Sequence, residues 1–134
     1  MKVVVDTNVI VSAQLNANEP PAKIVSLILN GRLKLLYDNR ILFEYIEVLS
    51  RKEFGFNNEI INDLIDFFKH EGEYINADHS NENFHDETDR KFYEVHKSGD
   101  AQYLITGNLR HFPGEATIIN PANFLLKSGQ EGER

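Results

Sequence analysis

The chain has 134 residues and contains no cysteine. Disulfide bonds, Cys-ligated zinc sites and a cysteine nucleophile are therefore excluded. Basic residues are also few, because 14 Lys and Arg stand against 21 Asp and Glu and give a formal net charge of −7. This balance argues against a broad basic surface and leaves room only for a small basic groove beside an acidic site. Any nucleic acid is therefore expected to bind locally.

Long apolar runs are missing as well. The longest, such as residues 3–5 and 27–29, fall far short of the roughly 18 residues that a membrane span needs. Asp6 interrupts the first run too early for a secretory signal, so we expect no membrane contact and a cytoplasmic protein. The composition, with 41% hydrophobic residues, is that of an ordinary globular domain. We expect one domain over residues 1–127 and a disordered tail over 128–134.

Short apolar segments alternate with amphipathic ones along the chain. Strands are predicted at residues 3–5, 33–37, 74–75, 103–106 and 117–119, and helices begin near residues 20, 38, 57, 88 and 121. Residues 7–15 are interpreted only as a short connecting segment. Unalternating apolar strands between helices predict an α/β domain with a mostly parallel sheet that is covered on both faces. Ligands of such sheets bind beyond the carboxyl ends of the strands, which directs attention to Asp6 and residues 106–108.

Three separate acidic positions could reach that edge of the sheet. Asp6 follows the first strand directly, although an Asp there also commonly serves as a cap or turn residue. Glu44 borders the apolar face of its helix, where pairing with Arg51 or Arg40 is the plainer alternative.

The third position is a cluster of acids at residues 86–89, at the predicted start of a helix, where acidic side chains are favoured by the helix dipole alone. Asp89 is the member expected to point inward. Oxygen ligands without Cys or paired His suit a hard cation such as Mg²⁺ or Mn²⁺. One or two such ions can promote hydrolysis of a phosphodiester.

Four segments give the sequence a resemblance to a known family. They are Val4 to Ser12 (VVDTNVIVS), Ile41 to Arg51 (ILFEYIEVLSR), Asp86 to Phe92 (DETDRKF) and Asp100 to Asn108 (DAQYLITGN). In this order and spacing they resemble the PIN domain family, in particular its bacterial and archaeal branch of VapC-like toxin components. The resemblance extends from Val3 to about Leu125 and implies a three-layer α/β/α sandwich with a five-stranded sheet in the order 3-2-1-4-5.

The resemblance also implies an endoribonuclease that uses Mg²⁺ or Mn²⁺. Asp6, Glu44 and Asp89 match the three most regular acidic positions of the family and are the expected metal ligands. The fourth position is acidic in many members, but here it is Asn108, which keeps an oxygen ligand and lacks the charge. The expected catalytic set is therefore Asp6, Glu44, Asp89 and Asn108. Auxiliary roles are expected for three further residues: Asp86, Asp100 and Thr106.

Residues beside this site could contact RNA. Arg110 and His111 follow Asn108, and together with Lys91 they could hold phosphates of a single-stranded RNA. Phe112 is interpreted as packing inward rather than stacking on a base. Further partners implied by the resemblance alone are an antitoxin protein laid across the acidic site and a second copy of the chain in a homodimer.

Three hypotheses follow for the function. The first is a ribonuclease of a toxin–antitoxin pair, in which a metal-activated water attacks the phosphorus in line. The second is a weak or inactive PIN-like module that binds RNA or a protein, which Asn108 favours. The third is an aspartyl-phosphate enzyme or receiver-like domain. It ranks below the others, because such phosphatases need a second Asp two residues after the first, where this chain has Asn8.

Overall fold

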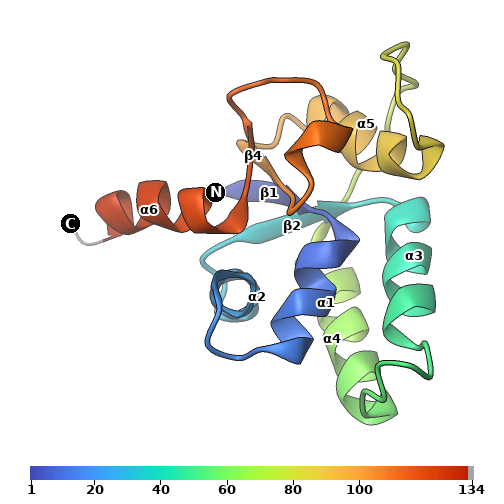
Figure 1. Ribbon diagram of the computed structural model, residues 1–134, viewed down its shortest axis with the longest axis vertical. Coiled ribbons are helices and arrows are strands. Elements are labelled where there is room, and N and C mark those ends of the chain that lie inside the picture. Colours follow the sequence, from blue (N-terminus) through green and yellow to red (C-terminus); the bar gives the residue numbers. More distant parts are fainter. Residues whose placement is uncertain (133–134) are drawn as a thin grey trace.

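The computed structural model describes residues 1–132 of the chain. Strands and helices alternate along most of it (Figure 1). In chain order the elements are β1 (Lys2–Val5), α1 (Thr7–Leu15), α2 (Pro20–Leu29), β2 (Lys34–Tyr37), α3 (Asn39–Leu49), α4 (Asn58–Glu71), β3 (Glu73–Tyr74), the 3-10 helix η1 (Glu87–Asp89), α5 (Arg90–Ser98), β4 (Tyr103–Ile105), the 3-10 helix η2 (Leu109–His111), β5 (Ile118–Ile119) and α6 (Pro121–Gly132).

The five strands form one sheet in the order β3-β2-β1-β4-β5, and every neighbouring pair is parallel. The order predicted from the resemblance is thereby confirmed. Strand β1 lies in the centre, with Val3 opposite Leu35 of β2 on one side and opposite Tyr103 of β4 on the other. The carboxyl ends of all strands therefore meet at one edge of the sheet.

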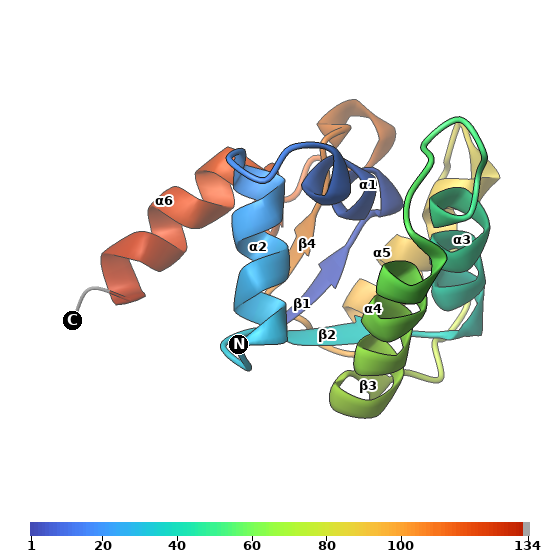
Figure 2. The ribbon, with the colours of Figure 1, turned by 90° about the horizontal axis from the view of Figure 1, so that it is seen from below.

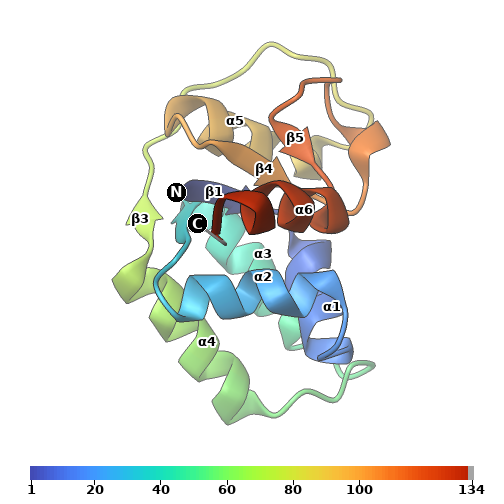
Figure 3. The same ribbon diagram turned by 90° about the vertical axis from the view of Figure 1, so that its left-hand side faces the viewer.

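Helices cover both faces of the sheet, so the three-layer α/β/α arrangement is also confirmed. Helix α5 lies on one face, and α1, α2 and α4 lie on the other (Figures 1 and 3). Val3, Val4 and Val5 of β1 have no exposed surface. Burying a valine side chain completely stabilises a fold by roughly 1.5–3 kcal/mol, which explains why this short unalternating strand occupies the centre.

Helix α1 is a feature that the sequence analysis missed. Residues 7–15 contain the β-branched run Val9-Ile10-Val11, which has low intrinsic helix propensity and no helical periodicity. Thr7, Val9, Ile10, Val11 and Ala13 are all buried, because α1 packs between α2 and α3 on one face of the sheet (Figure 3). Tertiary packing therefore stabilises this helix in spite of its sequence.

Side-chain caps place several helix starts where the sequence predicts them. The Asp38 carboxylate accepts a hydrogen bond from the Ile41 N–H, 3.0 Å away, at the start of α3. Asn57 accepts one from the Ile60 N–H at 3.1 Å at the start of α4. Such caps contribute about 1 kcal/mol each.

Helix α6 continues beyond Leu126, where the predicted last helix ends, and reaches Gly132. Residues 128–132 of the expected disordered tail are thus helical, because Gly129 does not break the helix, and residues 133–134 lie outside the described residues. In the view from below, α6 lies beside α2 and extends away from the sheet (Figure 2). No helix in the described part of the chain is long and apolar enough to cross a membrane.

Candidate functional site

Asp6 lies at the carboxyl end of the central strand, directly after Val5. Only 5% of Asp6 is exposed, and its side chain does not cap α1 although it occupies the N-cap position. Instead its Oδ2 accepts a hydrogen bond of 2.8 Å from the hydroxyl of Thr106, which follows β4. Asp6 therefore makes no capping hydrogen bond to α1, and two neighbouring strand ends together hold its carboxylate.

Glu44 reaches the same edge from α3. Its Oε2 accepts a hydrogen bond from the Thr7 hydroxyl, and its Oε1 lies 2.7 Å from Nζ of Lys91 on α5. The pairing with Arg51 or Arg40 considered from the sequence does not occur: Arg51 pairs with Glu47, and Arg40 pairs elsewhere. Glu44 is thus held at the site by two partners from other elements.

The acids at residues 86–89 divide into two roles. Asp86 is exposed and caps η1, since its Oδ1 accepts hydrogen bonds from the N–H and the hydroxyl of Thr88 at 2.9 and 2.7 Å. Asp89 is buried and its side chain caps no helix. Its Oδ2 is buried without a hydrogen bond from any described residue, although Nδ1 of His111 lies 3.2 Å away. Asp89 is therefore the inward-pointing acid, as the sequence analysis proposed.

These side chains line one open cavity of about 380 Å³ at the carboxyl edge of the sheet. Its lining comprises Asp6, Thr7, Asn8, Val11, Ser12, Glu44, Val48, Phe54, Asp86, Asp89, Asn108 and His111. Four acids and no Lys or Arg belong to this lining among the described residues. The fold thus gathers negative charge at the edge where parallel sheets bind ligands.

Burial, and then the proximity of other carboxylates, raises the pKa values of two acids in the cavity. Burial raises the pKa of Asp6 to about 6, the Thr106 hydrogen bond opposes this rise, and the charges of Asp89 and Glu44 add to it. The pKa of Asp89 is also raised, first by burial and then by the charge of Asp86. Raised pKa values in a cluster of acids indicate unbalanced negative charge, which is typical of functional sites.

The segment after β4 closes one side of the cavity. The N–H of Asn108 donates a hydrogen bond to the Thr106 hydroxyl at 2.9 Å, so Thr106 links Asp6 to this segment. Arg110 is exposed on η2, and His111 is half exposed beside Asp89. Phe112 is buried and packs edge-on against Phe84, with ring centroids 6.1 Å apart, which agrees with its expected inward orientation.

Asp100 does not join the other predicted site residues. It lies in the turn between α5 and β4 with φ of 52°. This turn precedes β4, whereas the acidic cavity follows it, so the two lie at opposite edges of the parallel sheet. The left-handed backbone of Asp100 is one that Asp and Asn adopt more readily than most residues.

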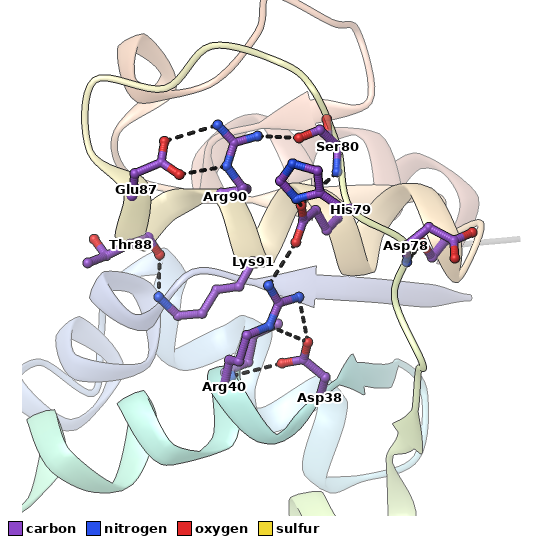
Figure 4. A network of polar contacts seen from close by, with 12 residues as sticks. Asp38, Arg40, Asp78, His79, Ser80, Glu87, Thr88, Arg90 and Lys91 are labelled. Atoms are coloured by element: carbon purple, nitrogen blue, oxygen red, sulfur yellow. Dashed lines mark hydrogen bonds and ion pairs between the residues drawn. The ribbon is translucent and has the colours of Figure 1, made fainter.

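A network of ion pairs and hydrogen bonds fixes the loop that leads to η1 (Figure 4). Glu94 of α5 is 3% exposed and accepts hydrogen bonds from the Ser80 N–H and from Arg40, both at 2.7 Å. Arg40 also pairs with Asp38 at 2.7 Å, and Arg90 donates to the Ser80 carbonyl. The loop is thereby attached to both α3 and α5, which positions η1 and Asp89.

The donor chemistry of the cavity fits a hard divalent cation. The Asp89 Oδ2, which accepts no hydrogen bond from the described residues, and the carboxylate of Asp6 are oxygen ligands of the kind that Mg²⁺ and Mn²⁺ prefer. Glu44 would be the third ligand, but both of its oxygens are engaged. No three His, Asp or Glu side chains within residues 1–129 converge closely enough to form a metal-binding group.

Sequence reasoning missed some residues of the cavity. Thr7 orients Glu44 through its hydroxyl, although the sequence analysis gave it no role. Phe54 lines the cavity from the segment between α3 and α4 and stacks on Phe56, with ring centroids 5.3 Å apart. The available signal for Phe54 was an aromatic residue in an otherwise polar connection.

Comparison with known proteins agrees with this geometry. The family model of the PIN domain matches residues 2–110, which contain the ends of β1 to β4 and the four acids of the cavity. The chain is also 35% identical over 115 residues to the uncharacterized protein MJ1680 of Methanocaldococcus jannaschii, covering 81% of this chain and 71% of that protein. The chain therefore belongs to the PIN domain family.

Proposed function

We propose that this chain is a metal-dependent endoribonuclease that cuts single-stranded RNA and forms the toxin component of a toxin–antitoxin pair. PIN domains are generally nucleases that use divalent metal ions. The observation that carries the proposal is the acidic cavity itself, in which Asp6 and Asp89 have raised pKa values and one buried Asp89 oxygen accepts no hydrogen bond from the described residues. Such a cluster is costly for the fold and is balanced when a cation binds.

In this proposal Asp6, Glu44 and Asp89 hold Mg²⁺ or Mn²⁺. When bound, the ion would polarise the phosphodiester and activate water for attack. Thr106 holds the Asp6 carboxylate at the strand end through its hydroxyl. Asn108 has an uncharged amide in the cavity lining, which can accept or donate a hydrogen bond toward a phosphate or a water molecule.

The second candidate is a PIN domain that binds RNA or a protein without cutting. Two observations favour it: Asn108 stands where many members have an acid, and Glu44 is engaged by Thr7 and Lys91. Both candidates use the same cavity, so only a measurement of cleavage separates them.

The proposed partners have supporting surface features. Arg110 and His111 are exposed beside the cavity and suit RNA phosphates. Phe43 and Ile46 are 64% and 39% exposed on the helix that carries Glu44, and they suit an antitoxin segment. A homodimer is supported by a largely apolar cavity of about 580 Å³ between α2 and α6.

The test is cleavage of a mixed-sequence single-stranded RNA by purified protein in Mn²⁺, in Mg²⁺ and in EDTA. Asp6→Asn should abolish metal-dependent cutting, since it removes a ligand charge from the cavity. Asp100→Asn is the matched control: it makes the same chemical change at the opposite edge of the sheet, where Asn also tolerates φ of 52°, and it should cut like the wild type.

Two results would contradict the nuclease proposal. Cutting that survives Asp6→Asn would identify a contaminating nuclease. Folded wild type that binds RNA without cutting it in either metal would favour the inactive module.

A further inference from the structure

Lys91 is a buried cation at an acidic site. It follows Arg90 at the start of α5, and its side chain is only 10% exposed. Its Nζ lies 2.7 Å from Glu44 Oε1. The same Nζ donates a hydrogen bond to the Thr88 carbonyl of η1 (Figure 4). A buried ammonium is costly unless it is paired, so these two contacts explain why Lys91 is tolerated there.

The other cations near the site have different partners. Arg40 pairs with Asp38 and Glu94, and Arg90 pairs with Glu87. Among the Lys and Arg side chains of the described residues, Lys91 is therefore the one that forms an ion pair with an acid of the cavity. A surface phosphate would have to compete with Glu44 for its ammonium group.

Both Glu44 oxygens have close partners, whereas Asp89 Oδ2 faces only Nδ1 of His111, 3.2 Å away. Oε1 pairs with Lys91 and Oε2 accepts from Thr7, while Asp89 Oδ2 lacks a hydrogen bond. Of the three carboxylates, Glu44 is thus the one that an ammonium group holds, so a metal ion that binds Oε1 has to compete with a positive charge. A divalent cation approaching Glu44 meets the positive charge of Lys91 at the same oxygen.

We propose that Lys91 is an internal counter-cation of the acidic cavity, which holds Glu44 until a divalent cation competes for that carboxylate. Lys91 thereby lowers the affinity of the site for the cation and stabilises the metal-free fold. This inference rests on the proposed metal site and extends it, because it names the residue that sets the affinity. Lys91 is a positioning residue that acts through Glu44.

The first experiment measures Mn²⁺ affinity by titration calorimetry and Tm in EDTA for three proteins. Lys91→Met removes the charge and keeps most of the apolar stem, and Lys91→Arg keeps the charge. Lys91→Met should melt at a lower temperature in EDTA and bind Mn²⁺ about tenfold more tightly, because a like charge a few ångströms from a divalent ion is removed. Lys91→Arg should bind Mn²⁺ within about threefold of wild type.

The second experiment uses wild-type protein alone and so does not depend on the folding of a variant. Amine acetylation followed by mass spectrometry reports whether Lys91 is accessible in EDTA and in saturating Mg²⁺. Release from Glu44 should raise the labelling of Lys91 several-fold in Mg²⁺, while the exposed Lys69 of α4 should not change. Equal protection of Lys91 in both conditions would overturn the proposal.

The results also separate this inference from the proposed function. A lower Tm of Lys91→Met with unchanged or weaker Mn²⁺ affinity would show a purely structural role and overturn the inference, even if the wild type cuts RNA. The expected shifts in affinity without RNA cleavage would support the inference and contradict the nuclease. Absence of Mn²⁺ binding by the wild type and by Lys91→Met would overturn the inference and the proposed nuclease function together.

Discussion

Replacing Asp6 with Asn should change the pH dependence of the stability of the metal-free protein. The free energy of unfolding of Asp6→Asn, minus that of the wild type, should be larger at neutral pH than at acidic pH. Burial, with the nearby charges of Asp89 and Glu44, raises the pKa of Asp6 from 3.8 to about 6 in the folded state. Between these two values the folded chain binds more protons than the unfolded chain. The free energy of unfolding of the wild type therefore falls as the pH rises through this window, and the loss is complete above about pH 6.

The size of the effect follows from the shift. One pKa unit corresponds to about 1.36 kcal/mol, so a rise from 3.8 to about 6 costs the wild type about 3 kcal/mol at pH 7.5. The amide that Asp6→Asn introduces carries no charge and escapes this cost. Its N–H groups enter a buried position and can cost roughly 1–3 kcal/mol if they remain unpaired. That second cost does not change with pH, so the pH dependence isolates the charge.

The assay is urea unfolding of both proteins in EDTA at several values between pH 4 and pH 7.5. The stability of Asp6→Asn minus that of the wild type should increase by about 2–3 kcal/mol from pH 4 to pH 7.5, since a small part of the cost is already present at pH 4. Loss of the Thr106 hydroxyl should raise the pKa of Asp6 further, because its hydrogen bond to Asp6 lowers that pKa. A difference that stays within about 1 kcal/mol over this range would refute the reasoning that Asp6 is destabilised when ionised.

Three further predictions concern the residues that support the site. Gly72→Ala should cost roughly 1–3 kcal/mol in urea unfolding, because its Cβ would lie 2.5 and 2.8 Å from two backbone carbonyl oxygens; an unchanged midpoint would mean that the α4–β3 turn can shift. Tyr45→Phe should also lower the free energy of unfolding, by about 1–3 kcal/mol. It removes the hydroxyl that donates a hydrogen bond to the buried Val5 carbonyl. Equal stability of the two proteins would show that this carbonyl does not need the hydroxyl. Glu94→Gln should weaken the ion pairs that fasten residues 76–86 and speed limited proteolysis within that loop, whereas an unchanged cleavage rate would mean that other contacts hold it.

The sheet could be predicted well because its signals are local. The run of three valines, the Asp38 and Asn57 caps, and Gly31 with φ of 83° mark element boundaries independently of the rest of the fold. The strand order came from the resemblance and was confirmed. Helix α1 was missed because its stability comes from burial on several sides, which a β-branched sequence does not reveal.

The candidate site was predictable in its acids and less so in their partners. Asp6, Glu44 and Asp89 were singled out as acids next to apolar segments, and the structure brings them to one cavity. Asp100 was also considered for this cavity because it is close to β4 in sequence. It precedes β4, however, and therefore lies at the amino end of that strand, opposite the cavity. Roles of all these residues in metal binding and catalysis stay predictions.

The sequence by itself determined most elements of this protein, helix α1 excepted, and the types of side chain at their ends, because hydrophobic periodicity, caps and strand-terminal acids are encoded within a few neighbouring residues. Only the tertiary structure decided which charges meet. Glu44 had two basic candidates, Arg51 and Arg40, yet its partner is Lys91, which lies 47 positions further along the chain. Pairing of charges depends on where α3, η1 and α5 pack around the sheet, and that arrangement is set by the whole core.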